Sequence, residues 1–326
     1  MKHLFTVVGA LAAVGALVLT GCSSAENSSA GASGESVTVQ NCGTDVTFNK
    51  TPERMVLLKS AAVPALHDLG VLDQVVARAG AYPDAYYDQA TRDELNKIPM
   101  LSDDLDAGGH LNISKDTVIA QQPDLVLGEV DNLDRASLSQ LGIPLIEEPA
   151  MCKSGAPEHQ SFDSIYDQLE TYGTIFNKKD RADAAISDLK TRVDAVKKQV
   201  GDGDGRTAAV LYPTVGGGTT YAYGSKSMAE PQLEAAGFKN VFGDVDQRVF
   251  EVTGEELINR NPDVLILLYS EGDEQAVADA VKNLPGAGSI TAVRDNQMLV
   301  QLMNFTEPAT PLAVDGLERI VERFYQ

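Results

Sequence analysis

The segment ISKDTVIAQQPDLVL (residues 113–127) and the later segment VTGEELINRNPDVLI (residues 252–266) follow the same pattern. Each begins with a helix-capping residue, Ser114 or Thr253, followed by acidic and apolar residues at helical spacing. A Pro ends each helix, and an Asp leads into Leu, Val and Ile residues typical of a buried parallel strand. Two helix–Pro–Asp–strand units at matching places predict two similar α/β lobes.

A long helical stretch over residues 178–200 lies between the two units. Its apolar residues recur at helical spacing, and no Gly or Pro interrupts it before GDGDGR, which predicts its end. A helix of about 23 residues spans about 34 Å, which is long enough to connect two lobes. We therefore expect an N-terminal lobe over 37–177, a connecting helix over 178–201 and a C-terminal lobe over 202–326.

The amino end, residues 1–21, reads as an export signal. A short positive start precedes an uncharged apolar run that is marginal for a membrane span. The motif LTGC ending at Cys22 resembles the lipobox of bacterial lipoproteins, which implies that Cys22 is lipidated and becomes the first mature residue. An ordinary secretion signal cleaved near Ser23 is the alternative.

Residues 22–36 predict a flexible tether, because after Cys22 they are almost all Ser, Ala, Gly, Asn and Glu. Such a tether would hold the folded part at the outer face of the cell membrane, with the lipid as the only membrane contact. The chain carries 26 Lys and Arg against 47 Asp and Glu, a formal net charge of −21. This charge excludes nucleic acid as a partner and disfavours anionic headgroups. We expect a monomer.

Cys42 and Cys152 are the two cysteines that remain besides Cys22. In an exported protein they favour a disulfide, and two separate buried thiols are the alternative.

Several segments in a fixed order carry a family resemblance. They follow the lipobox and are PERMVLL (52–58), LGVLDQVVARAG (69–80), PDLVLG (123–128), the long helix, LEAAGFKNVFGDV (233–245), VTGEELINRNPDVLILLY (252–269) and ITAVRDNQMLVQLM (290–303). The chain resembles the substrate-binding lipoproteins of bacterial ABC importers that deliver ferric siderophores, cobalamin and haem, the class III, iron-complex type. The resemblance implies two Rossmann-like lobes joined by one long rigid helix, with a ligand cleft between them. It also implies a membrane permease and a cytoplasmic ATPase as partners.

Permease docking departs from the pattern of that family. Its members commonly carry a glutamate on each lobe that meets permease arginines, but Pro64 and Pro231 stand at the matching positions here. The nearby acidic residues Asp68 and Glu230 are therefore the candidates for docking.

Candidate ligand-binding residues follow the carboxyl ends of the expected strands, where open α/β sheets bind ligands. They are Lys59, Ser60, Tyr82, His110, Glu129, Tyr212, Tyr221, Tyr223, Arg248, Tyr269, Asn304 and Glu307, and Tyr86 and Tyr87 lie close to them in the sequence. A tyrosine offers an apolar face and one hydroxyl, which suits a binding cleft. For any single tyrosine, half-buried packing is the alternative.

Catalytic and metal-site motifs are missing from the sequence. It has no Gly-x-Ser-x-Gly, His-Glu-x-x-His or Cys-x-x-Cys, so we expect no enzyme activity and no resident cofactor or metal. Zinc or manganese binding is an alternative function, although no His pair has ligand spacing.

The ligand class follows from the acidic residues at the strand ends expected to face the cleft, which are Glu129, Asp131, Glu147, Glu148, Glu271, Asp273 and Glu307. They would repel a triply anionic ferric catecholate, which needs a cluster of Arg or Lys. A neutral or cationic ferric hydroxamate siderophore is therefore the first expectation. Cobalamin or haem comes next, the haem being held between His110 and Tyr221 or Tyr223.

Overall fold

The computed structural model describes residues 36–106 and 110–325, and these described residues form one compact unit. The predicted signal, Cys22, nearly all of the tether, and Gly108 and Gly109 lie outside the described residues. Within the described part, no helix is both long enough and apolar enough to cross a membrane.

The first half of this unit is built on a five-stranded parallel sheet with strand order β5-β4-β3-β6-β7. Its strands are β3 (Met55–Leu57), β4 (Val75–Ala79), β5 (Met100–Ser102), β6 (Leu125–Leu127) and β7 (Leu145–Ile146). A separate antiparallel hairpin, β1 (Val37–Asn41) and β2 (Thr44–Phe48), precedes it. The helices are α1 (Val63–Leu69), α2 (Gln89–Leu95), α3 (Lys115–Ile119) and α4 (Arg135–Ser139), with short helices η1 (Leu72–Gln74), η2 (Asp84–Tyr86) and η3 (Pro149–Met151).

The second half is built on a mixed sheet with order β11-β9-β8-β12-β13, in which β10 also pairs with β8. Its strands are β8 (Thr207–Pro213), β9 (Thr220–Tyr223), β10 (Lys239–Asn240), β11 (Val249–Val252), β12 (Val264–Tyr269) and β13 (Met298–Leu302). The helices are α7 (Ala229–Ala235), α8 (Gly254–Arg260), α9 (Glu274–Lys282), α10 (Thr291–Arg294) and α11 (Pro311–Phe324), with η4 (Ala287–Ser289) and η5 (Met303–Phe305). The two-lobe α/β fold expected from the repeated units is confirmed.

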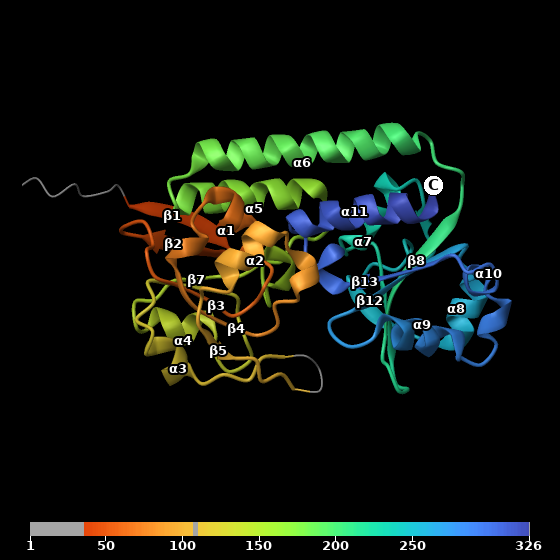
Figure 1. Ribbon diagram of the computed structural model, residues 1–326, viewed down its shortest axis with the longest axis horizontal. Helices are drawn as coiled ribbons and strands as arrows, with labels where there is room; N and C mark the ends of the chain where they lie inside the picture. The colour runs from red at the N-terminus through yellow and green to blue at the C-terminus, as the bar shows by residue number, and fades with distance from the viewer. Residues whose placement is uncertain (1–35, 107–109, 326) are drawn as a thin grey trace, which may run out of the picture. The chain divides into compact units, whose positions relative to one another are not determined.

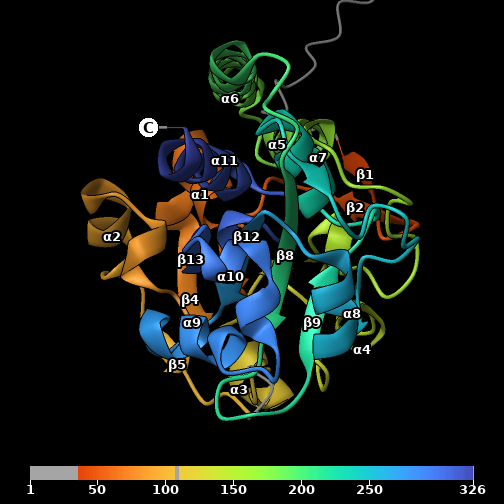
Figure 2. The same ribbon diagram turned by 90° about the vertical axis from the view of Figure 1, so that its right-hand side faces the viewer.

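Two helices, α5 (Phe162–Ile175) and α6 (Lys179–Val200), follow the first sheet and precede the second. Figure 1 shows α6 running alongside α5 and on past α11. In Figure 2, α5, α7 and α11 lie between α6 and the strands. The apolar stripe of α6 is buried, as at Ile186, Leu189 and Val193. The role of α6 as a rigid link stays a prediction.

The two repeated units serve the same purpose in both halves. The carboxylate of Asp124 accepts the backbone N–H groups of Glu53 and Arg54, at 3.1 and 2.8 Å, just before β3. The carboxylate of Asp263 accepts the N–H and hydroxyl of Thr207, both at 2.8 Å, where β8 begins. Each Pro–Asp step therefore fixes the start of the central strand of its sheet.

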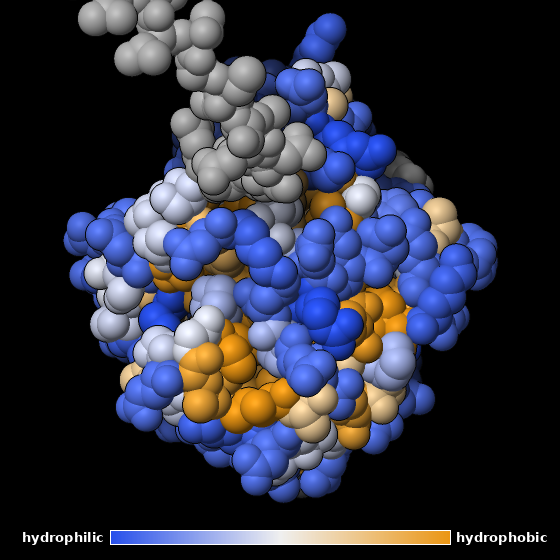
Figure 3. All heavy atoms as spheres, turned by 90° about the vertical axis from the view of Figure 1, so that its left-hand side faces the viewer, coloured by the Kyte–Doolittle hydropathy of each residue, from blue (hydrophilic) through white to orange (hydrophobic). Residues whose placement is uncertain are grey.

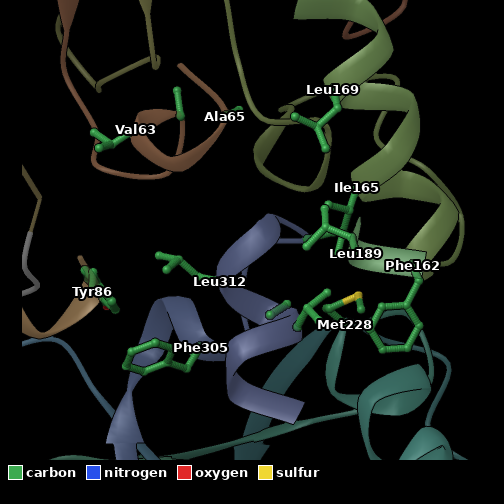
Figure 4. Close-up of a cluster of buried hydrophobic side chains, with 14 of the residues drawn as sticks. Val63, Ala65, Tyr86, Phe162, Ile165, Leu169, Leu189, Met228, Phe305 and Leu312 are labelled. Atoms are coloured by element: carbon green, nitrogen blue, oxygen red, sulfur yellow. The ribbon is translucent and has the colours of Figure 1, made fainter. Parts of the chain in front are cut away.

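One buried apolar cluster connects the halves. Figure 4 shows side chains from α1, α5, α6, η5 and α11 converging on it, including Ile165, Leu189, Phe305 and Leu312. The core that supports both sheets is therefore continuous behind the place where they face each other.

Candidate functional site

A cavity of about 480 Å³ lies where the carboxyl ends of the parallel strands of the two sheets meet. The first half lines it mainly with loops after β3, β4, β6 and β7, and the second half with Arg248, Ser270, Glu271, Met303, Asn304 and Pro308. We call this cavity the cleft.

The N-terminal wall of the cleft is organised around the buried carboxylate of Glu147. Its Oε2 atom accepts Lys59 Nζ at 2.5 Å and the Glu129 N–H at 2.8 Å. Its Oε1 atom accepts the Glu148 N–H, also at 2.8 Å. A buried carboxylate with one cation and two N–H donors is well compensated, so Glu147 draws three segments of the wall together.

Glu148, the next residue, lies in a different environment. It is only 5% exposed, and its Oε1 atom accepts the Tyr172 hydroxyl at 2.9 Å. Its Oε2 atom is buried without a hydrogen-bond partner among the described residues. Burial, together with the neighbouring charge of Glu147, raises the pKa of Glu148 to about 7, against the lowering effects of the Tyr172 hydroxyl and the Lys59 charge. Glu148 is thus a carboxyl group that titrates near neutral pH.

The C-terminal wall carries one arginine, Arg248, held from behind by Glu307. Glu307 is fully buried and accepts Arg248 Nη1 at 3.0 Å and the Met228 N–H at 2.6 Å. Burial raises the pKa of Glu307, and the positive charge of Arg248 opposes that shift. Within the described residues, Nε and Nη2 of Arg248 have no hydrogen-bond partner, so two N–H edges stay available to a ligand.

The two walls touch at Asn304 of η5. The Asn304 N–H donates to the Tyr86 hydroxyl at 2.9 Å, and its Nδ2 donates to Ser60 Oγ at 3.1 Å. The ring of Phe305 packs edge-on against that of Tyr86, with 5.3 Å between centroids. These contacts define one side of the cleft.

Six of the twelve candidate ligand residues line the cleft together. They are Lys59, Ser60, His110, Glu129, Arg248 and Asn304. Glu307 lies behind Arg248, as described above. Whether any of them contacts a ligand stays a prediction.

The five candidate tyrosines are not in the cleft lining. The hydroxyl of Tyr82 donates to Leu57 O at 3.3 Å, that of Tyr212 donates to Ser270 Oγ at 3.1 Å, and that of Tyr269 donates to Glu274 at 2.9 Å. Tyr223 is buried, and Tyr221, two positions earlier in β9, is exposed. Proximity to a strand end therefore does not by itself bring a tyrosine to the cleft.

Glu147 and Glu148 line the cleft, as their place at an acidic strand end indicated, and so does Tyr86, which was read together with Tyr82, although none of the three was among the twelve candidates. Sequence reasoning missed Met151, the last residue of η3, and Lys153, which pairs with Glu129 at 2.7 Å. The signal for that segment is Cys152, which the structure joins to Cys42 in a disulfide.

The two docking candidates lie outside the cleft. Asp68, near the end of α1, is exposed beside a hollow that also contains Asp188 and Asp315. The carboxylate of Glu230 accepts Asn240 Nδ2 at 2.7 Å, so it is engaged within its own lobe. Pro64 and Pro231 lie within α1 and α7. A docking role for Asp68 or Glu230 stays a prediction.

Comparisons with known proteins match nearly the whole described chain. The family model described as periplasmic binding protein matches residues 55–300. A crystal structure from Saccharomonospora viridis DSM 43017, titled as an ABC-type Fe3+-hydroxamate transport system, is 55% identical. It has a TM-score of 0.84 and covers 89% of this chain and 99% of its own.

Two curated proteins are similar at lower identity. The uncharacterized ABC transporter substrate-binding lipoprotein YvrC of Bacillus subtilis (strain 168) is 23% identical over 86% of this chain and 82% of its own. A cobalamin-binding protein of Halobacterium salinarum (strain ATCC 29341 / DSM 671 / R1) is 25% identical over 83% of this chain and 71% of its own.

Proposed function

This chain belongs to the periplasmic binding protein family, and on that basis we propose that it captures a ferric hydroxamate siderophore and delivers it to an ABC permease. The family consists of transport and binding proteins rather than enzymes. Membership confirms the resemblance drawn from the ordered sequence segments. The 55% identical structure, whose title names Fe3+-hydroxamate transport, supports the ligand class.

The observation that carries the ligand class is the pairing of the cations in the cleft. Each lysine or arginine of the lining is matched with a carboxylate, in the pairs Lys59–Glu147, Lys153–Glu129 and Arg248–Glu307. The lining also contains further acidic side chains, Asp131, Glu148 and Glu271. A triply anionic ferric catecholate would face net negative charge here, whereas a neutral or cationic ferric hydroxamate avoids that repulsion.

Arg248 is the side chain best prepared to contact such a ligand. Glu307 fixes one edge of its guanidinium, and Nε and Nη2 remain available, as described above. The oxygens of a ferric hydroxamate carry partial negative charge and accept hydrogen bonds, so the free guanidinium edge suits them. Asn304 and Ser60 add neutral polar groups to the same lining.

Cobalamin is the second candidate, supported by the similar cobalamin-binding protein. Its amide rim would suit the same neutral polar groups. Haem has less support, because neither Tyr221 nor Tyr223 lines the cleft opposite His110. Zinc or manganese binding has the least support. In residues 36–106 and 110–325, no three His, Cys, Asp or Glu side chains are grouped to hold an ion.

The site of action that we propose is the outer face of the cell membrane, with Cys22 lipidated. The lipobox at residues 19–22 and the tether after it support this proposal. A Cys22→Ser variant should be released into the medium and bind its ligand as tightly as the native chain. A variant that stays bound to the membrane would contradict the lipid anchor.

Titration of the full chain carrying Cys22→Ser tests the ligand class. We expect micromolar or tighter binding of ferrioxamine, which is cationic, and ferrichrome, which is neutral. Much weaker binding is expected of a ferric catecholate, cyanocobalamin and hemin. Arg248→Gln should weaken hydroxamate binding at least about tenfold. Its matched control, Arg260→Gln, removes an arginine of the same lobe that lies outside the cleft lining. This control should leave hydroxamate binding unchanged. Tight binding of the catecholate alone would overturn the charge argument.

A further inference from the structure

Asn41, the last residue of β1, is a buried polar side chain outside the cleft. It is 4% exposed and lies on the same strand face as the buried Val39, at a position where an apolar residue would continue the pattern. A buried amide destabilises a protein unless its hydrogen bonds are satisfied, so its partners explain its presence.

Both ends of the Asn41 amide bind the backbone of one cleft residue. Its Nδ2 donates to Glu147 O at 2.8 Å, and its Oδ1 accepts the Glu147 N–H at 3.0 Å. Glu147 directly follows β7, the edge strand of the first sheet, and the hairpin itself pairs with no strand of that sheet. Asn41 therefore supplies, with its side chain, the pair of hydrogen bonds that a neighbouring strand would supply.

Arg135 of α4 fixes the orientation of that amide. Its Nη2 donates to Asn41 Oδ1, and its Nη1 donates to Leu145 O at 2.6 Å. Since a guanidinium can only donate, the oxygen of Asn41 has to face it, which leaves the Asn41 nitrogen directed at Glu147 O. The Asn41 side chain is thus held in the one orientation that suits Glu147.

The next residue of the hairpin, Cys42, is fastened to the same segment through its disulfide to Cys152. The hairpin is therefore attached near both ends of the segment 147–153, which contributes Glu147, Glu148, Met151 and Lys153 to the cleft. Figure 3 views this end of the N-terminal lobe, where hydrophilic side chains predominate around a few apolar hollows.

What depends on this attachment is the layout of charge in the cleft. The Glu147 carboxylate holds Lys59 after β3, the Glu129 N–H after β6 and the Glu148 N–H. A shift of the Glu147 backbone would move a carboxylate with three partners. We propose that Asn41 is a positioning residue for ligand binding, acting from outside the cleft through the Glu147 backbone. This inference rests on the proposed function, in which the cleft holds the ligand.

The test compares Asn41→Leu with Val39→Ala, in the full chain carrying Cys22→Ser. Leu fills a similar space but leaves both Glu147 backbone groups without their partner. Val39→Ala removes a buried side chain from the same strand face without touching Glu147, and so controls for loss of stability. Asn41→Asp keeps the acceptor for the Glu147 N–H and for Arg135 but loses the donor, so its effects should be intermediate; it also serves if Asn41→Leu does not fold.

Two measurements are made on each variant. Without ligand, amide hydrogen exchange at Glu129 and Glu148 should become at least about tenfold faster in Asn41→Leu and stay unchanged in Val39→Ala. With ferrioxamine, the dissociation constant of Asn41→Leu should rise at least about tenfold, against less than twofold for the control.

Unchanged exchange in Asn41→Leu would overturn the inference, and so would faster exchange with unchanged affinity. If the reference chain binds none of the hydroxamates, the proposed function fails. The exchange measurement then still decides whether Asn41 positions the cleft wall.

Discussion

In the N-terminal lobe the cleft wall is fastened by two ion pairs and a disulfide, whereas in the C-terminal lobe one ion pair, Arg248–Glu307, stands beside a network of uncharged hydrogen bonds. The central group there is the buried Gln232 of α7, whose Nε2 donates to Phe305 O and Ala313 O, both at 2.7 Å. Its Oε1 accepts the Thr306 hydroxyl at 2.8 Å, and that hydroxyl accepts Gln301 Nε2 at 3.0 Å. This network holds η5, which carries Asn304.

The two lobes thus fix their central strands in the same way, but their cleft walls are held together in different ways. Asp124 and Asp263 fix equivalent strands through equivalent contacts, because the same short pattern is repeated in the sequence. The walls are built from segments without a counterpart in the other half. A disulfide and two ion pairs therefore hold one wall, and a neutral network with one ion pair holds the other, so the two should respond differently to reductant and substitution.

Removal of the disulfide should have the largest effect on this comparison. Cys42→Ser with Cys152→Ser should lower the free energy of unfolding by about 4 kcal/mol, because the bridge closes a long loop in the unfolded chain. Urea denaturation measures this loss. Reductant should reproduce it in the native chain and change nothing further in the double variant. A loss below about 1 kcal/mol would show that the hairpin is held without the bridge.

Disruption of the neutral network comes next. Gln232→Leu should lower the free energy of unfolding by about 3 kcal/mol, since it leaves two backbone carbonyls and the Thr306 hydroxyl with fewer partners in a buried site. Gln275→Leu on the exposed face of α9 is the matched control and should change stability little. If both variants lose the same free energy of unfolding, the buried network adds no stability beyond that of an exposed glutamine.

The pH dependence of stability should distinguish the walls further. Glu148 has a pKa of about 7 in the folded protein, above its ordinary value of 4.5, mainly because it is buried. The folded state thus binds this proton more tightly, and the stability present below about pH 4.5 is lost as the pH rises toward 7. The loss should be on the order of 2 kcal/mol.

Glu148→Gln should flatten this dependence, because an amide does not titrate. Thermal unfolding between pH 5 and pH 8 measures it, and Glu158→Gln, at an exposed position, serves as the control. If the native chain is equally stable at pH 5 and pH 8, Glu148 does not titrate between these values.

The smallest effect concerns the shared scaffold. Asp124→Asn and Asp263→Asn should each lower the free energy of unfolding by about 1 kcal/mol, because each keeps one acceptor and loses the charge. Chemical denaturation of both variants under one set of conditions tests whether the two sites are equivalent. A difference above about 1 kcal/mol between them would weaken the parallel between the lobes.

The parts of the molecule that were predictable from the sequence depend on local signals. Caps at Ser114 and Thr253, and the Pro–Asp steps after them, act within a few residues, so two α/β lobes could be inferred from the chain alone. The cleft depends on contacts between residues that are distant in the sequence. Asn304 contacts Tyr86, which is 218 positions away, and Lys153 follows Cys152, which a disulfide joins to Cys42. No local pattern records such contacts, and the choice of tyrosines failed to identify the cleft lining for that reason.

The contact of Asn304 with Ser60 and Tyr86 also bears on how a ligand leaves. These hydrogen bonds join the two halves at one side of the cleft. Opening that side means breaking both of them, and a change of conformation occurs only where some interaction favours the open form. The work of separating Asn304 from Tyr86 and Ser60 therefore falls to whatever removes the ligand.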